Sequence, residues 1–233
     1  MHENHRERMR VRFENQGFEH FAPHEVLETL LFYSIPRKNT NDIAHRLINT
    51  FGSFNNVLDA PVAELEKVEG MGHSSALYLK MIRESFGYYG VSVASTNKGM
   101  RTIEDCAAYL MAKLDGKRNE EVYMLCLDSK RSVINCVKLS EGDVCSANVS
   151  TRKAINLAIN NNAVAVVLAH NHPGGFALPS NEDVQVTNYL ATALYHTGIF
   201  LLDHIIVTNT DYVSLYSSKL YVPEELGIWM DRT

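Results

Sequence analysis

"AVAVVLAHNHPGGFALPSNED", residues 163–183, joins a strong strand signal to a cluster of polar residues. The run from Ala163 to Ala169 is apolar on both faces, as in a buried strand of an α/β sheet. Pro173 and the two glycines after it end that strand. A helix is then predicted to begin at Ser180. A buried strand that leads through a short loop into a helix is typical of α/β folds.

The flanking sequence extends this pattern in both directions. Strands show β-branched and aromatic residues between turn signals, and helices show apolar residues at helical spacing. The predicted elements are helices over 102–115, 150–163 and 179–198, and further strands over 120–128, 131–140, 199–209 and 211–217. Residues 101–225 are therefore expected to form a mixed α/β sandwich.

The N-terminal part reads differently. Residues 1–89 have helical periodicity and no strand alternation, so a separate helical domain over 1–90 is predicted. The stretch "GVSVASTNKGMR", residues 90–101, is small and polar. It is predicted to be a flexible linker between the two domains.

The composition limits the classes of protein. The chain has 233 residues and a net charge of −5, so the whole molecule is no general nucleic-acid binder. No signal peptide is recognised, and no apolar run reaches the length that spans a membrane. The four cysteines form no CxxC pair and are expected to be buried or half-buried thiols. A cytoplasmic protein without a membrane partner is predicted.

The two histidines at the strand end predict a metal site. His170 and His172 are two residues apart, so their side chains lie on one face of the strand. Asp183, in the first turn of the next helix, can face back toward them. Two imidazoles and one carboxylate suit Zn²⁺, with the fourth position open as in catalytic sites.

An alternative for the aspartate stays open. Ser180-x-x-Asp183 is also an N-capping pattern, a serine followed by an acid at the third helical position. A purely structural reading must then explain His-x-His, the glycine turn and this cap as separate coincidences. The metal site is the preferred interpretation.

"HNHPGGFALPSNED" resembles the JAMM motif, His-x-His-Pro followed by Ser-x-x-Asp. Residues 101–220 resemble the JAB/MPN domain of RadC-type proteins, which is a cytidine-deaminase-like α/β fold. The supporting stretches are "EEVYMLCLDSKRSVI", "NAVAVVLAHNHPGG", "PSNEDVQVT" and "LLDHIIVTNTDYVSL". The resemblance implies that His170, His172 and Asp183 bind zinc, and that Ser180 assists the water at the metal.

Hydrolysis by such a site requires a carboxylate that takes and returns a proton. In JAMM peptidases this residue is a glutamate at the start of an early strand, where this chain offers Glu120 and Glu121. Consecutive strand residues face opposite sides, so only one can reach the metal. We prefer Glu120; the alternative is that both are solvated acids.

Two further positions bear on this site. RadC relatives commonly carry an acid near Val137, and Glu141 lies too far along the strand to replace it. If that acid is needed for catalysis, this protein is expected to be weakened or inactive. Asp203-His204 interrupts an apolar strand. This pair either supports a ligand imidazole from behind or forms a buried Asp–His hydrogen bond.

The helical half contains "VEGMGHSSALYLKMI", residues 68–82, which resembles a helix-hairpin-helix. Gly70 and Gly72 allow a tight turn, and the amides of Gly72 and His73 can face a phosphate at a helix N-terminus. The motif predicts sequence-independent contact with the DNA backbone, with a plain structural connector as the alternative.

Two functions follow as hypotheses. The first is a JAMM-type zinc hydrolase with metallopeptidase-like chemistry, acting on a protein or peptide and linked by the family name to DNA repair or recombination. The second is a non-enzymatic DNA-binding or scaffolding protein with a structural or vestigial zinc site.

Overall fold

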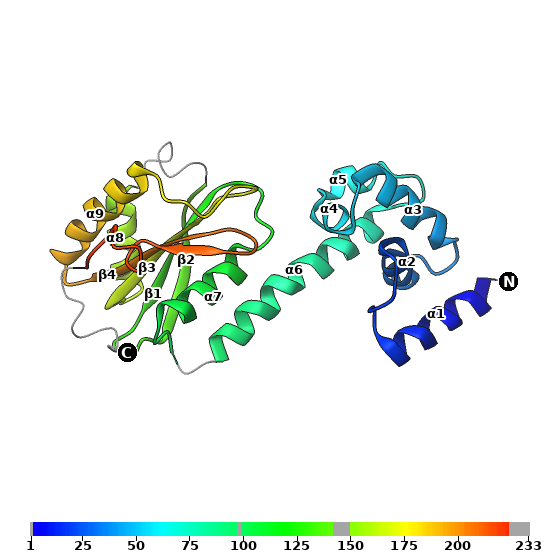
Figure 1. The fold of residues 1–233 in the computed structure, drawn as a ribbon, viewed down its shortest axis with the longest axis horizontal. Coiled ribbons are helices and arrows are strands. Elements are labelled where there is room, and N and C mark those ends of the chain that lie inside the picture. The colour runs from blue at the N-terminus through cyan, green and yellow to red at the C-terminus, as the bar shows by residue number, and fades with distance from the viewer. Residues whose placement is uncertain (1, 97–98, 142–149, 224–233) are drawn as a thin grey trace. The chain divides into compact units, whose positions relative to one another are not determined.

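The computed structural model describes residues 2–96, 99–141 and 150–223. The chain divides into two compact units after Phe86 (Figure 1). Residues 97 and 98 of the predicted linker, 224 and 225 of the predicted second domain, and Cys145 lie outside the described residues. The predicted division into 1–90 and 101–225 stays a prediction.

The first unit is helical, as the sequence predicts. Its helices are α1 (His2–Gln16), α2 (Pro23–Ser34), α3 (Thr40–Phe51), α4 (Phe54–Asp59), α5 (Val62–Leu65) and the start of α6 (His73–Thr96). One apolar core unites α2 to α6 through fully buried leucines, among them Leu27, Leu47 and Leu79. Burial of these side chains, rather than local propensity, stabilises such short helices.

The second unit is built on a five-stranded mixed sheet with the strand order β2-β1-β3-β4-β5 (Figure 1). Its elements are α7 (Ile103–Leu114), β1 (Glu121–Leu127), β2 (Val133–Glu141), α8 (Thr151–Asn160), β3 (Ala165–Asn171), α9 (Asn181–Tyr195), β4 (Phe200–Val207) and β5 (Tyr212–Ser214). β3 and β4 are parallel, and the other neighbouring pairs are antiparallel.

Each face of this sheet is covered by helices. α8 and α9 pack on one face through Ala154, Ala158 and Leu190, and α7 packs on the other through Ala107 and Leu110. Because both faces are covered, β1 and β3 are buried along their whole length. The predicted mixed α/β sandwich is confirmed.

The predicted flexible linker is wrong for residues 90–96, which are the last turns of α6. The small residues there serve close packing. A Cβ at Gly90 would lie 2.9 Å from the Cβ of Ala112, and one at Gly87 would lie 3.3 Å from the Ala112 carbonyl oxygen. Val91 and Ala94 pack into the core beneath α7. Small side chains let α6 and α7 approach each other, and the sequence pattern was mistaken for flexibility.

The described helices include none that is long and apolar enough to cross a membrane. The described thiols agree with the sequence prediction, since Cys106 and Cys126 are buried and Cys136 is half-buried. Burial raises the pKa of Cys106 and of Cys136 to about 12, so both remain protonated and unreactive at neutral pH.

Asp203 on β4 is a buried acid that connects β4 to the edge strand β5 and the residues after it. Its carboxylate accepts hydrogen bonds from the hydroxyl of Ser214 and from the backbone amides of His204 and Tyr216. Burial nevertheless dominates and raises its pKa from 3.8 to about 6. The folded protein therefore holds the proton more tightly than the unfolded chain does.

We expect this carboxyl to make stability depend on pH. Its contribution is full below about pH 4 and is lost as the pH rises through about 6, by roughly 3 kcal/mol. The difference in unfolding free energy between wild type and Asp203→Asn should shift by about 2 kcal/mol between pH 4.5 and 7.5, because part of the contribution is already lost at pH 4.5. Urea unfolding of the metal-free protein measures it. Asp211→Asn, at an exposed position, is the control, and an equal shift in that variant contradicts the assignment.

Candidate metal centre

The candidate site lies where β3 ends and the chain enters β1. His170 on β3 is paired with Val122 on β1, and paired residues present their side chains on the same face. Glu120 lies two residues before Val122, so it shares that face. α9 covers the same face, and Asp183 is in its first turn. Three segments, the end of β3, the start of β1 and the first turn of α9, thus bring polar side chains to one point.

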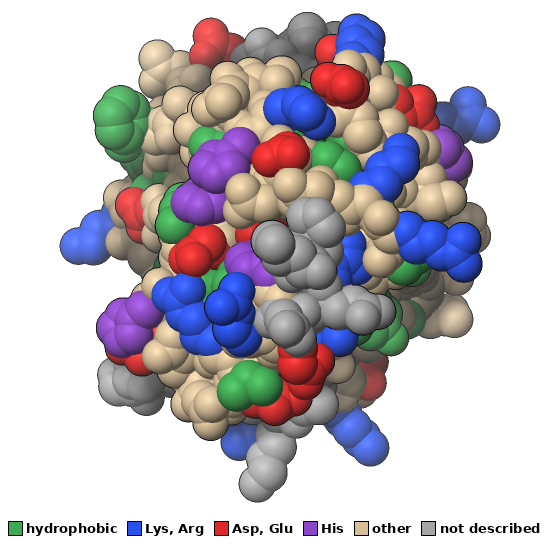
Figure 2. Space-filling view, turned by 90° about the vertical axis from the view of Figure 1, so that its right-hand side faces the viewer, with side chains coloured by type: hydrophobic (Ala, Val, Ile, Leu, Met, Phe, Trp, Pro, Cys, Tyr) green, Lys and Arg blue, Asp and Glu red, His purple; other side chains and the backbone are tan. Residues whose placement is uncertain are grey.

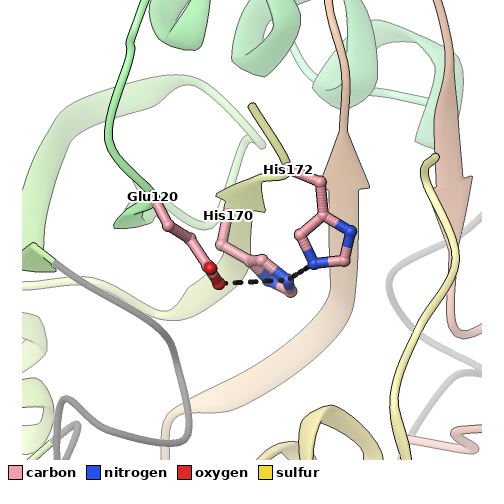
Figure 3. A group of neighbouring side chains, drawn as sticks. All are labelled: Glu120, His170 and His172. Carbon is pink, nitrogen blue, oxygen red and sulfur yellow. Dashed lines mark hydrogen bonds and ion pairs between the residues drawn. The ribbon is translucent and has the colours of Figure 1, made fainter. Parts of the chain in front are cut away.

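The ligand atoms are close together. His170 Nε2 lies 3.0 Å from His172 Nε2, 3.6 Å from Asp183 Oδ1 and 3.8 Å from Glu120 Oε1. Figure 3 shows Glu120 and His172 both directed at the ring of His170. Within the described ranges, Glu120, His170 and His172 form one group whose potential ligand atoms all lie within 4.8 Å of one another.

These separations fit a zinc ion. Two nitrogens bound to a tetrahedral zinc at about 2.0–2.1 Å are about 3.3 Å apart. The other nitrogen of His172, Nδ1, is 2.9 Å from the carbonyl oxygen of Phe176 and donates to it. Nε2 of a neutral His172 ring is therefore an acceptor, as a metal ligand must be. His170 and His172, predicted as zinc ligands from the sequence, both belong to this group, whose third member is Glu120. Asp183 lies 3.6 Å from His170 Nε2, and its ligand role stays a prediction.

The capping and ligand alternatives for Asp183 are compatible. Its Oδ2 accepts from the backbone amide and the hydroxyl of Ser180, each at 2.8 Å, and so completes the capping box of α9. Its Oδ1 is the oxygen directed at His170. The cap fixes one oxygen of a buried carboxylate and thereby aims the other into the site.

The structure separates the two candidate glutamates. Glu120 faces His170, whereas the carboxylate of Glu121 accepts from the hydroxyl of Tyr123 at 3.0 Å and lies 3.1 Å from Lys138 Nζ. The two residues take opposite sides, as strand alternation requires. Glu120 is thus the glutamate near the histidines, and its catalytic role stays a prediction.

The Ser180 hydroxyl is placed against Asp183, and its predicted role toward water is untested. Val137 on β2 is paired with Met124 on β1, four residues after Glu120. The absence of an acid at position 137 therefore removes no member of the group formed by Glu120, His170 and His172. The carboxylate of Glu141 is bound by Asn119 and Lys138.

Asn171 is a site residue that the sequence reasoning missed. It lies between the two histidines and points to the opposite face. Its Oδ1 accepts from the amide of Glu121 at 2.8 Å, and its Nδ2 donates to the carbonyl of Asn119 at 3.0 Å. Asn171 therefore holds the backbone on both sides of Glu120. An Asn between two ligand-type histidines was the available signal.

Of the two alternatives for Asp203-His204, the geometry agrees with a contact between His204 and His170, and the supporting role of His204 stays a prediction. Nε2 of the buried His204 lies 2.8 Å from His170 Nδ1. Asp203 projects to the other face of the sheet. Its carboxylate accepts a hydrogen bond from the backbone amide of His204 and not from the His204 ring. Burial, and then the neighbouring His170 and His172, hold the pKa of His204 well below its ordinary value.

The helix-hairpin-helix-like turn is placed before α6. Gly70 has a φ of +98°, and a Cβ there would lie 2.8 Å from the Ile43 side chain, so this glycine is required by the fold. Gly72 has open space around the Cβ position, so close packing does not require a glycine there, and its contact with phosphate stays a prediction. His73 Nδ1 lies 2.5 Å from Glu66 Oε1. Figure 2 shows Lys and Arg side chains interspersed with Asp and Glu on one face of the molecule.

A mixed five-stranded sheet covered on both faces, with a His-x-His strand end opposite a helix-start aspartate, defines a JAB-type α/β domain. The model of the RadC-like JAB domain matches residues 100–220. The chain belongs to the RadC family.

Curated relatives extend the similarity over nearly the whole chain. UPF0758 protein FN0909 of Fusobacterium nucleatum is 34% identical over 94% of this chain and 97% of its own length. UPF0758 protein SPO0054 of Ruegeria pomeroyi is 32% identical, over 88% and 91%. UPF0758 protein COPRO5265_1522 of Coprothermobacter proteolyticus is 34% identical, over 92% and 93%. The similarity therefore includes the helical unit as well as the JAB domain.

Proposed function

We propose that the JAB domain is a zinc-dependent hydrolase of the JAMM type that cleaves an amide or isopeptide bond in a protein or peptide. The supporting observation is the convergence of His172, Asp183 and Glu120 on His170 Nε2, within 3.0–3.8 Å. His170, His172 and Asp183 are the proposed ligands.

Glu120 is the residue proposed to transfer protons during hydrolysis. When bound, zinc polarises a carbonyl oxygen and makes water acidic enough to lose a proton near neutral pH. Glu120 is the proposed group that takes this proton and returns it to the leaving amine. Its side chain is 21% exposed, whereas that of Asp183 is 4% exposed. Glu120 is therefore the carboxylate that an incoming substrate can reach.

A nuclease is less supported. Two-metal phosphoryl chemistry requires a second metal site about 4 Å from the first. Among the described residues, Glu120, His170 and His172 form the one group of three or more side chains that could hold a metal ion. A single site suits the addition of water to a carbonyl group.

The test is a substrate screen on the full chain, with and without zinc. Peptide, isopeptide and single-stranded DNA substrates are incubated with the zinc-loaded protein and with the chelator-treated protein. We expect zinc-dependent cleavage of a peptide or isopeptide bond. Zinc binding without cleavage of any of the three favours the scaffolding alternative. Zinc-dependent cleavage of DNA alone overturns the peptidase proposal.

DNA stays a predicted partner of the helical unit. If Gly72 and His73 contact phosphate, binding will be weak and strongly salt-dependent. Gly72→Leu should abolish it without unfolding the chain, because the Cβ position is open. An anisotropy titration at low salt measures this. The Glu66 carboxylate beside His73 opposes phosphate binding. Unchanged DNA affinity in Gly72→Leu would identify the turn as a structural connector.

A further inference from the structure

A chain of buried polar groups runs behind the candidate metal centre. His170 Nδ1 lies 2.8 Å from His204 Nε2, and His204 Nδ1 lies 2.6 Å from the hydroxyl oxygen of Thr187. The Thr187 hydroxyl donates to the carbonyl oxygen of Asp183 at 2.6 Å. His170, His204 and Thr187 are fully buried. The chain thus begins at one proposed ligand and ends at the backbone of another.

The positions of the protons follow from the last acceptor. A carbonyl oxygen can only accept, so the single proton of the Thr187 hydroxyl lies toward Asp183. The Thr187 oxygen must then accept from His204, which places a proton on His204 Nδ1. A neutral His204 with Nδ1 protonated has an unprotonated Nε2. That nitrogen accepts from His170, so His170 carries its proton on Nδ1.

The consequence falls on the nitrogen that faces the site. A neutral His170 with its proton on Nδ1 has an unprotonated Nε2, which is the form that binds a metal. His172 reaches the same form through a different partner, the Phe176 carbonyl. The two rings therefore direct lone pairs at each other across 3.0 Å, an arrangement that a cation between them stabilises.

We propose that Thr187 and His204 are positioning residues that fix the tautomer of His170 and so prepare its Nε2 for zinc. This rests on the zinc site of the proposed function. Neither residue belongs to the group of potential ligand atoms. They act through His170, in the manner of the outer partners that orient metal-bound imidazoles.

Thr187→Val is the decisive variant, because valine has nearly the shape of threonine and lacks the hydroxyl. His204 Nδ1 then loses the hydroxyl oxygen that accepts its proton, and we expect the proton to move to Nε2. His204 donates to His170 Nδ1 in that form, which places the proton of His170 on Nε2. We expect zinc affinity to fall about 10- to 100-fold. Thr187→Ser keeps the hydroxyl and should bind zinc like the wild type.

Two measurements are made. Nitrogen NMR of the metal-free protein reports the tautomers directly, and competition with a chelator reports zinc affinity. We expect the Nδ1-protonated form of both His170 and His204 in wild type and Thr187→Ser, and the Nε2-protonated form of both in Thr187→Val. The wild-type spectrum is informative even if the valine variant unfolds.

The outcomes separate this proposal from the one it rests on. Wild type with His170 protonated on Nε2 overturns the tautomer assignment, and equal zinc affinity in Thr187→Val and Thr187→Ser overturns its effect on the metal. Wild type that shows the expected tautomers and binds no zinc overturns the proposed hydrolase and the role in zinc binding, while the tautomer assignment stands.

Discussion

His172→Ala should lower the affinity for zinc by more than about 100-fold. Losing a residue behind a ligand typically costs 10- to 100-fold, and losing the ligand itself costs more. The wild type is expected to bind about one zinc per chain. Competition titration with a chelator, together with metal analysis after gel filtration, measures both quantities.

His196→Ala is the matched control for this variant. His196 lies at the C-terminal end of α9 and is exposed, so its loss should leave zinc affinity unchanged. A wild-type protein that remains free of zinc after re-addition contradicts the site. Equal affinity in His172→Ala and the wild type contradicts the ligand assignment.

Glu120→Gln should retain zinc and lose hydrolysis by about 100- to 10,000-fold, the usual contribution of a positioned acid–base group. Glutamine has nearly the same shape but cannot take up the proton. Asp183→Asn should behave differently and lose zinc, because its buried Oδ1 is directed at His170. Turnover of the substrate found in the screen, measured beside zinc content, separates the two roles.

Glu121→Gln provides the control within the same strand. Its carboxylate binds Tyr123 and Lys138 on the other side of β1, so zinc content and turnover should both persist. Loss of zinc in Glu120→Gln identifies Glu120 as a ligand, as the close grouping with His170 and His172 also permits. Equal activity in Glu120→Gln and the wild type excludes it as the proton carrier.

The sequence alone predicted the class of fold, which the structure confirms, and the pair of histidines at the candidate site. The run before His170 is apolar on both faces, and this pattern is typical of a buried strand. Residues two apart on a strand lie on the same face, which places His170 and His172 together. Strand burial and side-chain direction within one strand are local properties, so a short stretch of sequence is enough to predict them. The same reasoning failed at residues 90–96, because small residues that permit close helix packing look like those of a flexible connector.

Only the tertiary structure shows which side chains lie next to His170 and His172. Alternation places Glu120 and Glu121 on opposite sides, but only the pairing of Val122 with His170 shows which side faces the site. The position of Asn171 between the two histidines marks it as a candidate, but only its contacts in the fold show that it holds the backbone around Glu120.

The contacts of Thr187 and His204 behind His170 were also decided by the tertiary structure. These residues lie on α9 and β4, and His204 is paired with Leu168, two residues before His170 on β3. Spacing along one element determines direction within that element. Contacts between elements depend on the strand register and on how the helices pack, which no short stretch of this sequence encodes.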